Sequence, residues 1–181
     1  MRFKLIALPV YFLAVAVVAQ DSVPSDVELH SMYCISSLQA WIDLGRRYLS
    51  QIETSANALP TTPKSPEDAK TVENLRQYYA TSADEQRQSL SRAQAALNRL
   101  QDYMLPKMQA RDPAALLLAT SRGTADFRDF KAMVERCGNR CNTMSKAPDD
   151  QAKAKACWDS CEDKDLIART RACQNPTWLP F

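Results

Sequence analysis

The spacing of the six cysteines restricts this chain more than any other feature of its sequence. Four of them form two Cys-x3-Cys pairs, Cys137 with Cys141 and Cys157 with Cys161, and residues four apart share one face of a helix. If Cys137 pairs with Cys161 and Cys141 pairs with Cys157, both pairs have their midpoint in the sequence at Asp149. Asp149 follows a proline and is expected to lie in a turn. An antiparallel helical hairpin therefore predicts the disulfides Cys137–Cys161 and Cys141–Cys157.

The twin motif, Cys137-Gly138-Asn139-Arg140-Cys141 and Cys157-Trp158-Asp159-Ser160-Cys161, resembles that of the small Tim chaperones of the mitochondrial intermembrane space. Hairpins of that family carry two such motifs. The resemblance covers about 25 of the 181 residues. It implies the same way of stapling a helical hairpin, and it predicts no family for the whole chain.

Four helices are predicted, over residues 25–59, 65–106, 112–147 and 149–173. Good helix formers dominate these segments, and Pro or Asp marks the joins. Ser25 and Glu28 have the spacing of a capping box, while serine and aspartate followed by proline open the second and third helices. The fourth is weakest at residues 162–165, which are polar all round, and we expect a bend or restart there.

Apolar residues recur at steps of three and four along the first three helices, which is typical of a helical bundle or coiled coil. Arg76 and Gln86 interrupt the stripe of the second helix, so that this seam is expected to be wet in places. Either a second chain packs against it or the monomer is loosely packed there. The stripe residues are Cys34, Leu38, Trp41, Gly45, Tyr48, Ile52, Ala56 and Leu59; Val72, Tyr79, Ala83, Leu90, Ala93, Leu97, Leu100 and Met104; and Leu116, Thr120, Gly123, Phe127, Phe130, Val134, Cys137, Cys141 and Met144.

The predicted fold is all-α: an elongated four-helix up-down bundle, or two long antiparallel helical hairpins, stapled by disulfides. In an up-down-up-down bundle the start of the first helix and the end of the fourth lie at the same end. Cys34 lies 25 residues before Leu59, and Cys173 lies 24 residues after Asp149, so the third predicted disulfide is Cys34–Cys173. No useful segment alternates apolar and polar residues with period two, and strands are not expected.

Residues 1–19 read as a cleaved signal peptide. Arg2 and Lys4 precede an apolar run from Leu5 to Ala19, which at 15 residues is short for a membrane span. We therefore expect a secreted or periplasmic protein with a single helical domain over residues 20–175 and a short tail over residues 176–181. No transmembrane span is predicted in the mature chain.

The mature chain is formally neutral. Removal of residues 1–19 leaves 21 basic side chains beside 21 acidic ones. Nucleic-acid binding depends on clustered excess Lys and Arg, so no nucleic-acid partner is expected. The three glycines in the chain are too few for phosphate-binding loops or nucleophile elbows.

No catalytic constellation is evident, and we predict neither an enzyme nor a cofactor. His30 is the single histidine, and no nucleophile can be assigned to it by spacing, so that an exposed or capping role is expected. The acid pairs Asp84-Glu85, Asp149-Asp150 and Asp163/Asp165 are expected on solvated helix faces.

The function predicted from these features is that of an exported, non-catalytic binding or structural module whose partner is another protein. The alternative is metal handling (zinc or copper) or thiol redox chemistry at the twin Cys-x3-Cys hairpin, because four thiolates could ligate such an ion. The proline-framed tail carrying Trp178 and Phe181 is expected to fold back on the bundle or to serve as an interface with the partner.

Overall fold

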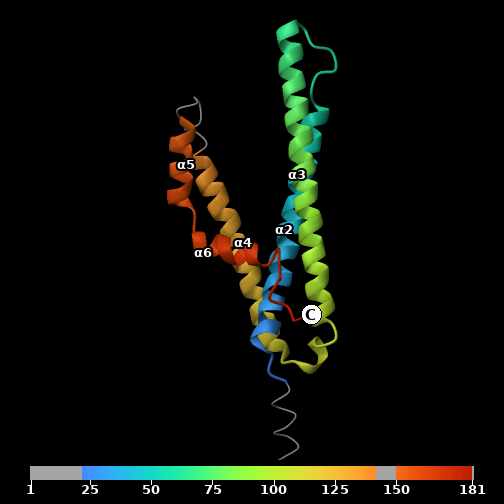
Figure 1. Cartoon of the computed structure of the whole chain (residues 1–181), viewed down its shortest axis with the longest axis vertical. Coiled ribbons are helices and arrows are strands. Elements are labelled where there is room, and N and C mark those ends of the chain that lie inside the picture. Colours follow the sequence, from blue (N-terminus) through green and yellow to red (C-terminus); the bar gives the residue numbers. More distant parts are fainter. Residues whose placement is uncertain (1–21, 142–149, 181) are drawn as a thin grey trace, which may run out of the picture.

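The computed structural model describes residues 22–141 and 150–180, and within these residues all regular structure is helical. The helices are α2 (Asp26–Asn57), α3 (Pro66–Met104), α4 (Pro113–Cys141), α5 (Asp150–Cys161) and α6 (Lys164–Ala172), with a short 3-10 turn, η1 (Met108–Ala110), before α4 (Figure 1). The all-α prediction is confirmed. The proposed signal peptide, the turn at Pro148-Asp149 and Phe181 lie outside the described residues.

The helices begin where the capping residues predict. The backbone N–H of Ser25 donates to Glu28 Oε2 at 2.8 Å, and the Ser25 hydroxyl accepts from the backbone N–H of Glu28 at 3.3 Å. Ser65 accepts in the same way from the backbone N–H of Asp68 at 3.1 Å, directly before Pro66. Local side-chain chemistry thus sets both helix starts.

The antiparallel pair α2/α3 holds most of the core. Ile42 and Leu38 of α2 lie in one buried cluster with Leu97, Leu100 and Met104 of α3. Leu38 and the three α3 residues are stripe positions that the sequence predicts, whereas Ile42, next to the stripe residue Trp41, was not predicted. The burial of these side chains from water is the main source of stability for the pair.

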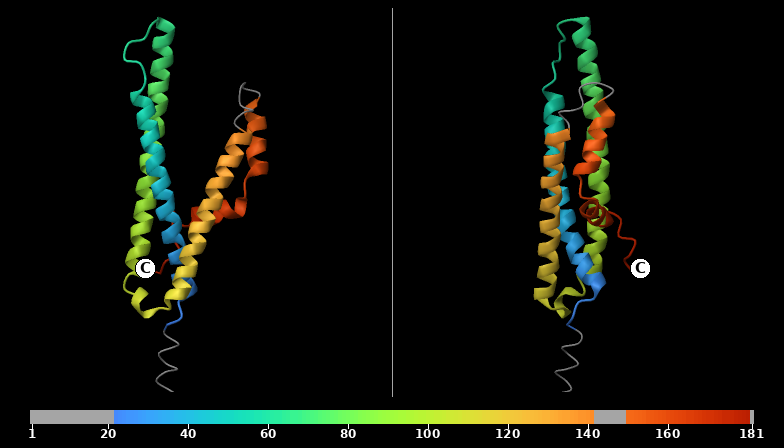
Figure 2. Two further views of the ribbon diagram at one scale, coloured as in Figure 1. Left: turned by 180° about the vertical axis from the view of Figure 1, so that it is seen from behind. Right: turned by 90° about the vertical axis from the view of Figure 1, so that its left-hand side faces the viewer.

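Helix α4 crosses α2 very closely at Gly123. A Cβ atom there would collide with the backbone carbonyl oxygen of Tyr33 and with the hydroxyl of Ser36. The Ser36 hydroxyl donates to the carbonyl oxygen of Thr120 across the crossing at 2.8 Å. Above this crossing α4 leans away from α2, so that α2/α3 and α4/α5 form two diverging arms (Figures 1 and 2).

The predicted fourth helix is two helices. Helix α5 ends at Cys161, and Asp163 starts α6 by accepting from the backbone N–H of Leu166 at 2.9 Å. Helix α5 packs along α4 and makes no comparable contact with the described parts of α2 or α3. The long helices therefore pack as antiparallel neighbours without closing into one four-helix bundle.

Three disulfides hold this arrangement: Cys137–Cys161 and Cys141–Cys157 between α4 and α5, and Cys34–Cys173 between α2 and the end of α6. These are the pairs that the spacing predicts. The Cα–Cα distances are 5.7, 5.6 and 5.1 Å, within the ordinary range for a disulfide.

The described part of the tail folds back on the helices. Pro176 and Leu179 are buried, and Trp178 packs against the core cluster. The Trp178 ring meets His30 edge-on, with 4.5 Å between the ring centroids. Trp178 therefore contacts its own chain, which agrees with the expectation that the tail folds back on the helices.

Candidate functional site

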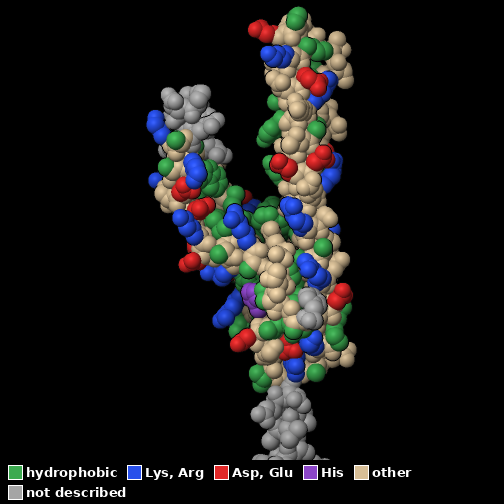
Figure 3. Space-filling model, in the orientation of Figure 1, with side chains coloured by type: hydrophobic (Ala, Val, Ile, Leu, Met, Phe, Trp, Pro, Cys, Tyr) green, Lys and Arg blue, Asp and Glu red, His purple; other side chains and the backbone are tan. Residues whose placement is uncertain are grey.

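An open groove of about 620 Å³ lies where the two arms diverge, between α2 and α4 (Figure 3). In Figure 3 hydrophobic side chains gather in this hollow. The residues that line the groove are Trp41, Leu44, Gly45, Arg47, Tyr48 and Gln51 of α2, Gln86 of α3, and Phe130, Lys131, Val134 and Glu135 of α4.

Aromatic side chains form the base of the groove. Trp41 packs against Phe127 and Phe130, with ring centroids 6.2 and 5.6 Å apart. The indole Nε1 of Trp41 is buried and has no hydrogen-bond partner among the described residues. Below this cluster, the arms are held together at the Gly123 crossing.

The walls of the groove carry apolar residues that stay in contact with solvent. Tyr48 is 50% exposed and Val134 is 39% exposed. The heptad-like stripes predict both as interior positions, and that prediction is wrong for both residues. Higher on α2, Gly45 still packs against Gln86 and Leu90 of α3. Because α5 lies along α4, no described helix fills the space between Tyr48 and Val134.

One of the two positions that interrupt the predicted seam of α3 also lines this groove. Gln86 approaches α2 at Gly45, where an added Cβ would lie 2.6 Å from Gln86 Nε2. Arg76 lies further along α3 and donates to the carbonyl oxygen of Pro60 at 3.0 Å. Of the two interruptions in the seam, only Gln86 therefore lies at the open groove.

Three charged side chains line the groove. Lys131 and Glu135 form an ion pair along α4, with 3.5 Å between Nζ and Oε1. Arg47 on the opposite wall makes no ion pair with the described residues, whereas the neighbouring Arg46 lies 3.9 Å from Asp43. The groove therefore carries a net positive charge that resides on Arg47.

A smaller hollow of about 260 Å³ adjoins the groove and shares Trp41, Phe130 and Val134 with it. Trp158 of α5 and Ile167 of α6 complete its lining together with other side chains. The apolar surface between the arms therefore extends beyond the groove itself.

The cysteine hairpin offers no free thiol. All six cysteines are in disulfides, and a thiolate is the form that binds zinc or copper(I) and that attacks another disulfide. Within the described residues, no three His, Cys, Asp or Glu side chains lie together as a metal site would need.

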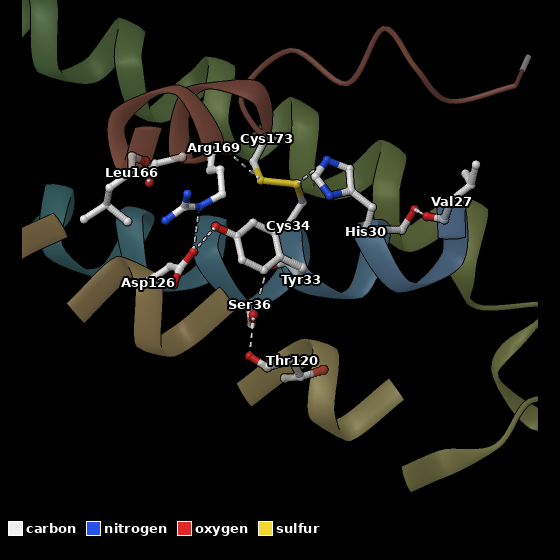
Figure 4. Close-up of a disulfide and its surroundings, with 12 residues drawn as sticks. Val27, His30, Tyr33, Cys34, Ser36, Thr120, Asp126, Leu166, Arg169 and Cys173 are labelled. Carbon is white, nitrogen blue, oxygen red and sulfur yellow. Dashed lines mark hydrogen bonds and ion pairs between the residues drawn. A yellow bond between two sulfur atoms is a disulfide. The ribbon is translucent and has the colours of Figure 1, made fainter. Parts of the chain in front are cut away.

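The Cys34–Cys173 disulfide lies beside a polar network that joins three helices (Figure 4). The Tyr33 hydroxyl donates to Asp126 Oδ2 at 2.9 Å, and Arg169 Nε donates to the same oxygen at 3.1 Å. Burial and the Asp126 carboxylate raise the pKa of Tyr33 to about 12. The network fastens α6 and α4 to α2. A hollow of about 290 Å³ opens beside it, lined by His30 and Tyr33 of α2 and by Arg122 and apolar side chains of α4.

His30 also lies at this end of α2, half-buried between Tyr33 and Trp178. Its Nε2 is 3.9 Å from Cys34 Sγ, and burial lowers the pKa of the imidazole. The expectation of an exposed or capping histidine is wrong, because the tail covers the ring and Ser25 provides the cap.

The candidate acid pairs occupy ordinary structural positions where they are described. Asp84 accepts from Arg87 at 2.9 Å on an exposed face, and Asp163 caps α6. Asp149 lies outside the described residues. Neither Asp84 nor Asp163 lines the groove.

No family model, curated protein or solved structure matches this chain. Among residues 22–141 and 150–180, no helix is both long and apolar enough to span a bilayer. Tyr48 and Val134, which the apolar stripes predict as core positions, are the groove residues for which the sequence prediction is wrong. The interrupted stripe at Gln86 was the signal that could have located them.

Proposed function

We propose that this protein is an exported, non-catalytic binding module that engages another protein through the groove between α2 and α4. Export is supported by the apolar leader with its basic start, and by six cysteines held in three disulfides, which are typical of an oxidising compartment.

The observation that carries the proposal is the solvent-exposed apolar lining of the groove. Trp41, Tyr48, Phe130 and Val134 lie where α2 and α4 diverge (Figure 2), and aromatic side chains in a concave site are good interface anchors. A non-catalytic role is supported by the absence of carboxylates, other than Glu135, and of histidine from the groove lining.

Cross-linking in the native compartment tests the proposal, with tagged wild-type protein and two aspartate variants. Val134→Asp places a charge in the groove, whereas Leu117→Asp places the same charge at a 66% exposed position outside it. We expect the same partner to be cross-linked by wild type and Leu117→Asp and to be lost from Val134→Asp. Equal recovery with all three proteins, or no specific partner, would overturn the proposal.

A further inference from the structure

We infer that the occupant of the groove is one amphipathic α-helix of the partner, with acidic residues beside its apolar face. The inference rests on the proposed function, since it names the chemistry of the partner at the same site. It is carried by the spacing of the apolar residues on the two walls and by the charge of Arg47.

The apolar residues on both walls have the spacing that receives a helix. On α2 they are Trp41, Leu44 and Tyr48, at steps of three and four, and on α4 they are Phe130 and Val134, four apart. Side chains at these steps form the ridges into which a facing helix packs. The stretch from Trp41 to Tyr48 covers about two helical turns, or roughly 10 Å.

The shape of the molecule leaves this side of the bundle open. Helix α2 packs against α3 and α4, but α5 lies along α4 and does not reach the seam between α2 and α4 above Trp41. Figure 2 shows the two arms separating in this region. A helix entering here would contact both walls and would complete the bundle that the apolar stripes predict.

Charge selects an acidic helix. Lys131 is neutralised by Glu135, and Arg47 has no ionic partner in the described chain. A carboxylate on the flank of the incoming helix would pair with Arg47. Because Arg47 is exposed, this pair contributes more to orientation and selectivity than to affinity.

An apolar small molecule fits the groove less well. Small-molecule sites usually enclose most of the ligand surface, whereas this groove runs between two diverging helices and leaves Tyr48 and Val134 in contact with solvent. A helix covers both residues at once.

Fluorescence anisotropy with labelled helical peptides of about 18 residues, or five turns, tests the inference on the full-length oxidised protein. The acidic peptide has leucines at steps of three and four with flanking glutamates. The basic peptide has lysine in place of each glutamate, and the scrambled peptide has the acidic composition with its leucines spread around the helix. Binding is measured at low ionic strength, where exposed charges are least screened.

We expect the acidic peptide to bind about fivefold more tightly than either of the other two. The basic peptide cannot pair with Arg47, and the scrambled peptide has no continuous apolar face. Arg47→Glu should reverse the preference toward the basic peptide, whereas Arg46→Glu, which makes the same charge change on the next residue, should keep it. Val134→Asp should weaken binding about tenfold or more, and Leu117→Asp should leave it unchanged.

The inference is overturned if the acidic peptide does not bind saturably, if Arg47→Glu leaves the preference unchanged, or if the control variants act like the groove variants. Saturable binding of dodecanoate that Val134→Asp abolishes, without peptide binding, would overturn it in favour of a small amphiphile. If the peptide test fails while the native partner is still lost from Val134→Asp, only the helical acidic occupant is refuted and the proposed function stands.

Discussion

At the scale of single residues, the close approach of α4 to α2 depends on Gly123. The missing side chain lets the α4 backbone reach the carbonyl oxygen of Tyr33 and the hydroxyl of Ser36. Neither obstacle can move freely, because one is backbone and the other is hydrogen-bonded to Thr120 across the crossing. The glycine in α4 thus serves helix packing, at the expense of helix propensity.

Gly123→Ala is expected to lower the free energy of unfolding by about 3 kcal/mol, because its Cβ collides with backbone at a packed crossing. Gly45→Ala is the matched control. Its Cβ would meet the side-chain ends of Gln86 and Leu90, which can shift, and the gain in helix propensity of about 1 kcal/mol offsets that contact. Urea unfolding measures both variants, and equal losses would contradict the assignment of Gly123 as the crossing point.

The ion pair between Glu28 and Arg111 makes the second residue-scale prediction. Arg111 Nε donates to Glu28 Oε2 at 2.9 Å, and its Nη2 donates to Oε1 at 3.0 Å. The Glu28 side chain is only 3% exposed. Burial alone would raise the pKa of Glu28, but the hydrogen bonds from Arg111 and Ser25 and the positive charge of Arg111 lower it overall.

Because the folded pKa of Glu28 is lowered, its contribution to stability is present above the unfolded value of about 4.5 and is lost as the pH falls through the folded value. Glu28→Gln is expected to lower the free energy of unfolding by about 2 kcal/mol at pH 7, since it leaves Arg111 without its carboxylate. This difference from wild type should shrink below pH 4.5 in urea unfolding curves. A difference that stays constant down to pH 3 would show that the Glu28 charge is not responsible.

At the scale of helices, the three disulfides act on different elements. Cys137–Cys161 and Cys141–Cys157 fasten α5 to α4, with sequence separations of 24 and 16 residues. Cys34–Cys173 joins residues 139 apart and holds the end of α6, and the tail that follows it, against α2. Helix α6 has only nine residues and would be marginal alone, so we infer that it depends on this disulfide and on the Arg169–Asp126 contact.

Replacing both Cys34 and Cys173 with serine is expected to release α6 and the tail while α4 and α5 stay paired. In the chain-entropy model this long loop contributes up to about 5 kcal/mol, against about 3 kcal/mol for Cys141–Cys157. Hydrogen exchange read by mass spectrometry should show loss of protection over residues 164–180. The Cys141→Ser/Cys157→Ser variant is the control and should retain that protection; exposure of residues 164–180 in both variants would contradict separate roles.

At the scale of the whole molecule, the two candidate functions differ in what stabilises the fold. In the proposed binding module it is the three disulfides, whereas in the metal-handling alternative a bound ion would link the cysteines. All six sulfurs are bonded in pairs in the structure. A reductant should therefore destabilise the binding module, whereas a chelator should destabilise a metal-binding protein.

A chelator is expected to leave the thermal midpoint unchanged, and a reductant is expected to lower it, because the disulfides limit the unfolded chain. The intact mass under denaturing conditions should be that of a chain beginning at Gln20, and it should lie six hydrogens below the mass of the same chain after reduction. Free thiols at the twin motif, together with a retained zinc or copper mass in the native state, would favour the metal-binding alternative instead.

Much of the helical architecture could be predicted from the sequence, because its signals are local. Ser25 with Glu28, and Ser65 before Pro66, satisfy the first backbone donors of their own helices without help from the rest of the chain. The cysteine pairs depend only on helical spacing and on one turn. The break before α6 lies at Asp163, in the polar segment where the sequence predicts a bend or restart.

The groove was decided by the tertiary structure alone. Apolar stripes indicate which helix faces avoid water, but they do not say which helix covers them. Tyr48 and Val134 lie on stripes that resemble core positions, and they remain exposed because α4 diverges from α2 above Gly123 and α5 packs on α4. The packing of α5 on α4 depends on contacts between residues far apart in the chain. Local sequence signals therefore determine the helices and the disulfides, whereas packing between distant segments determines the open groove between α2 and α4.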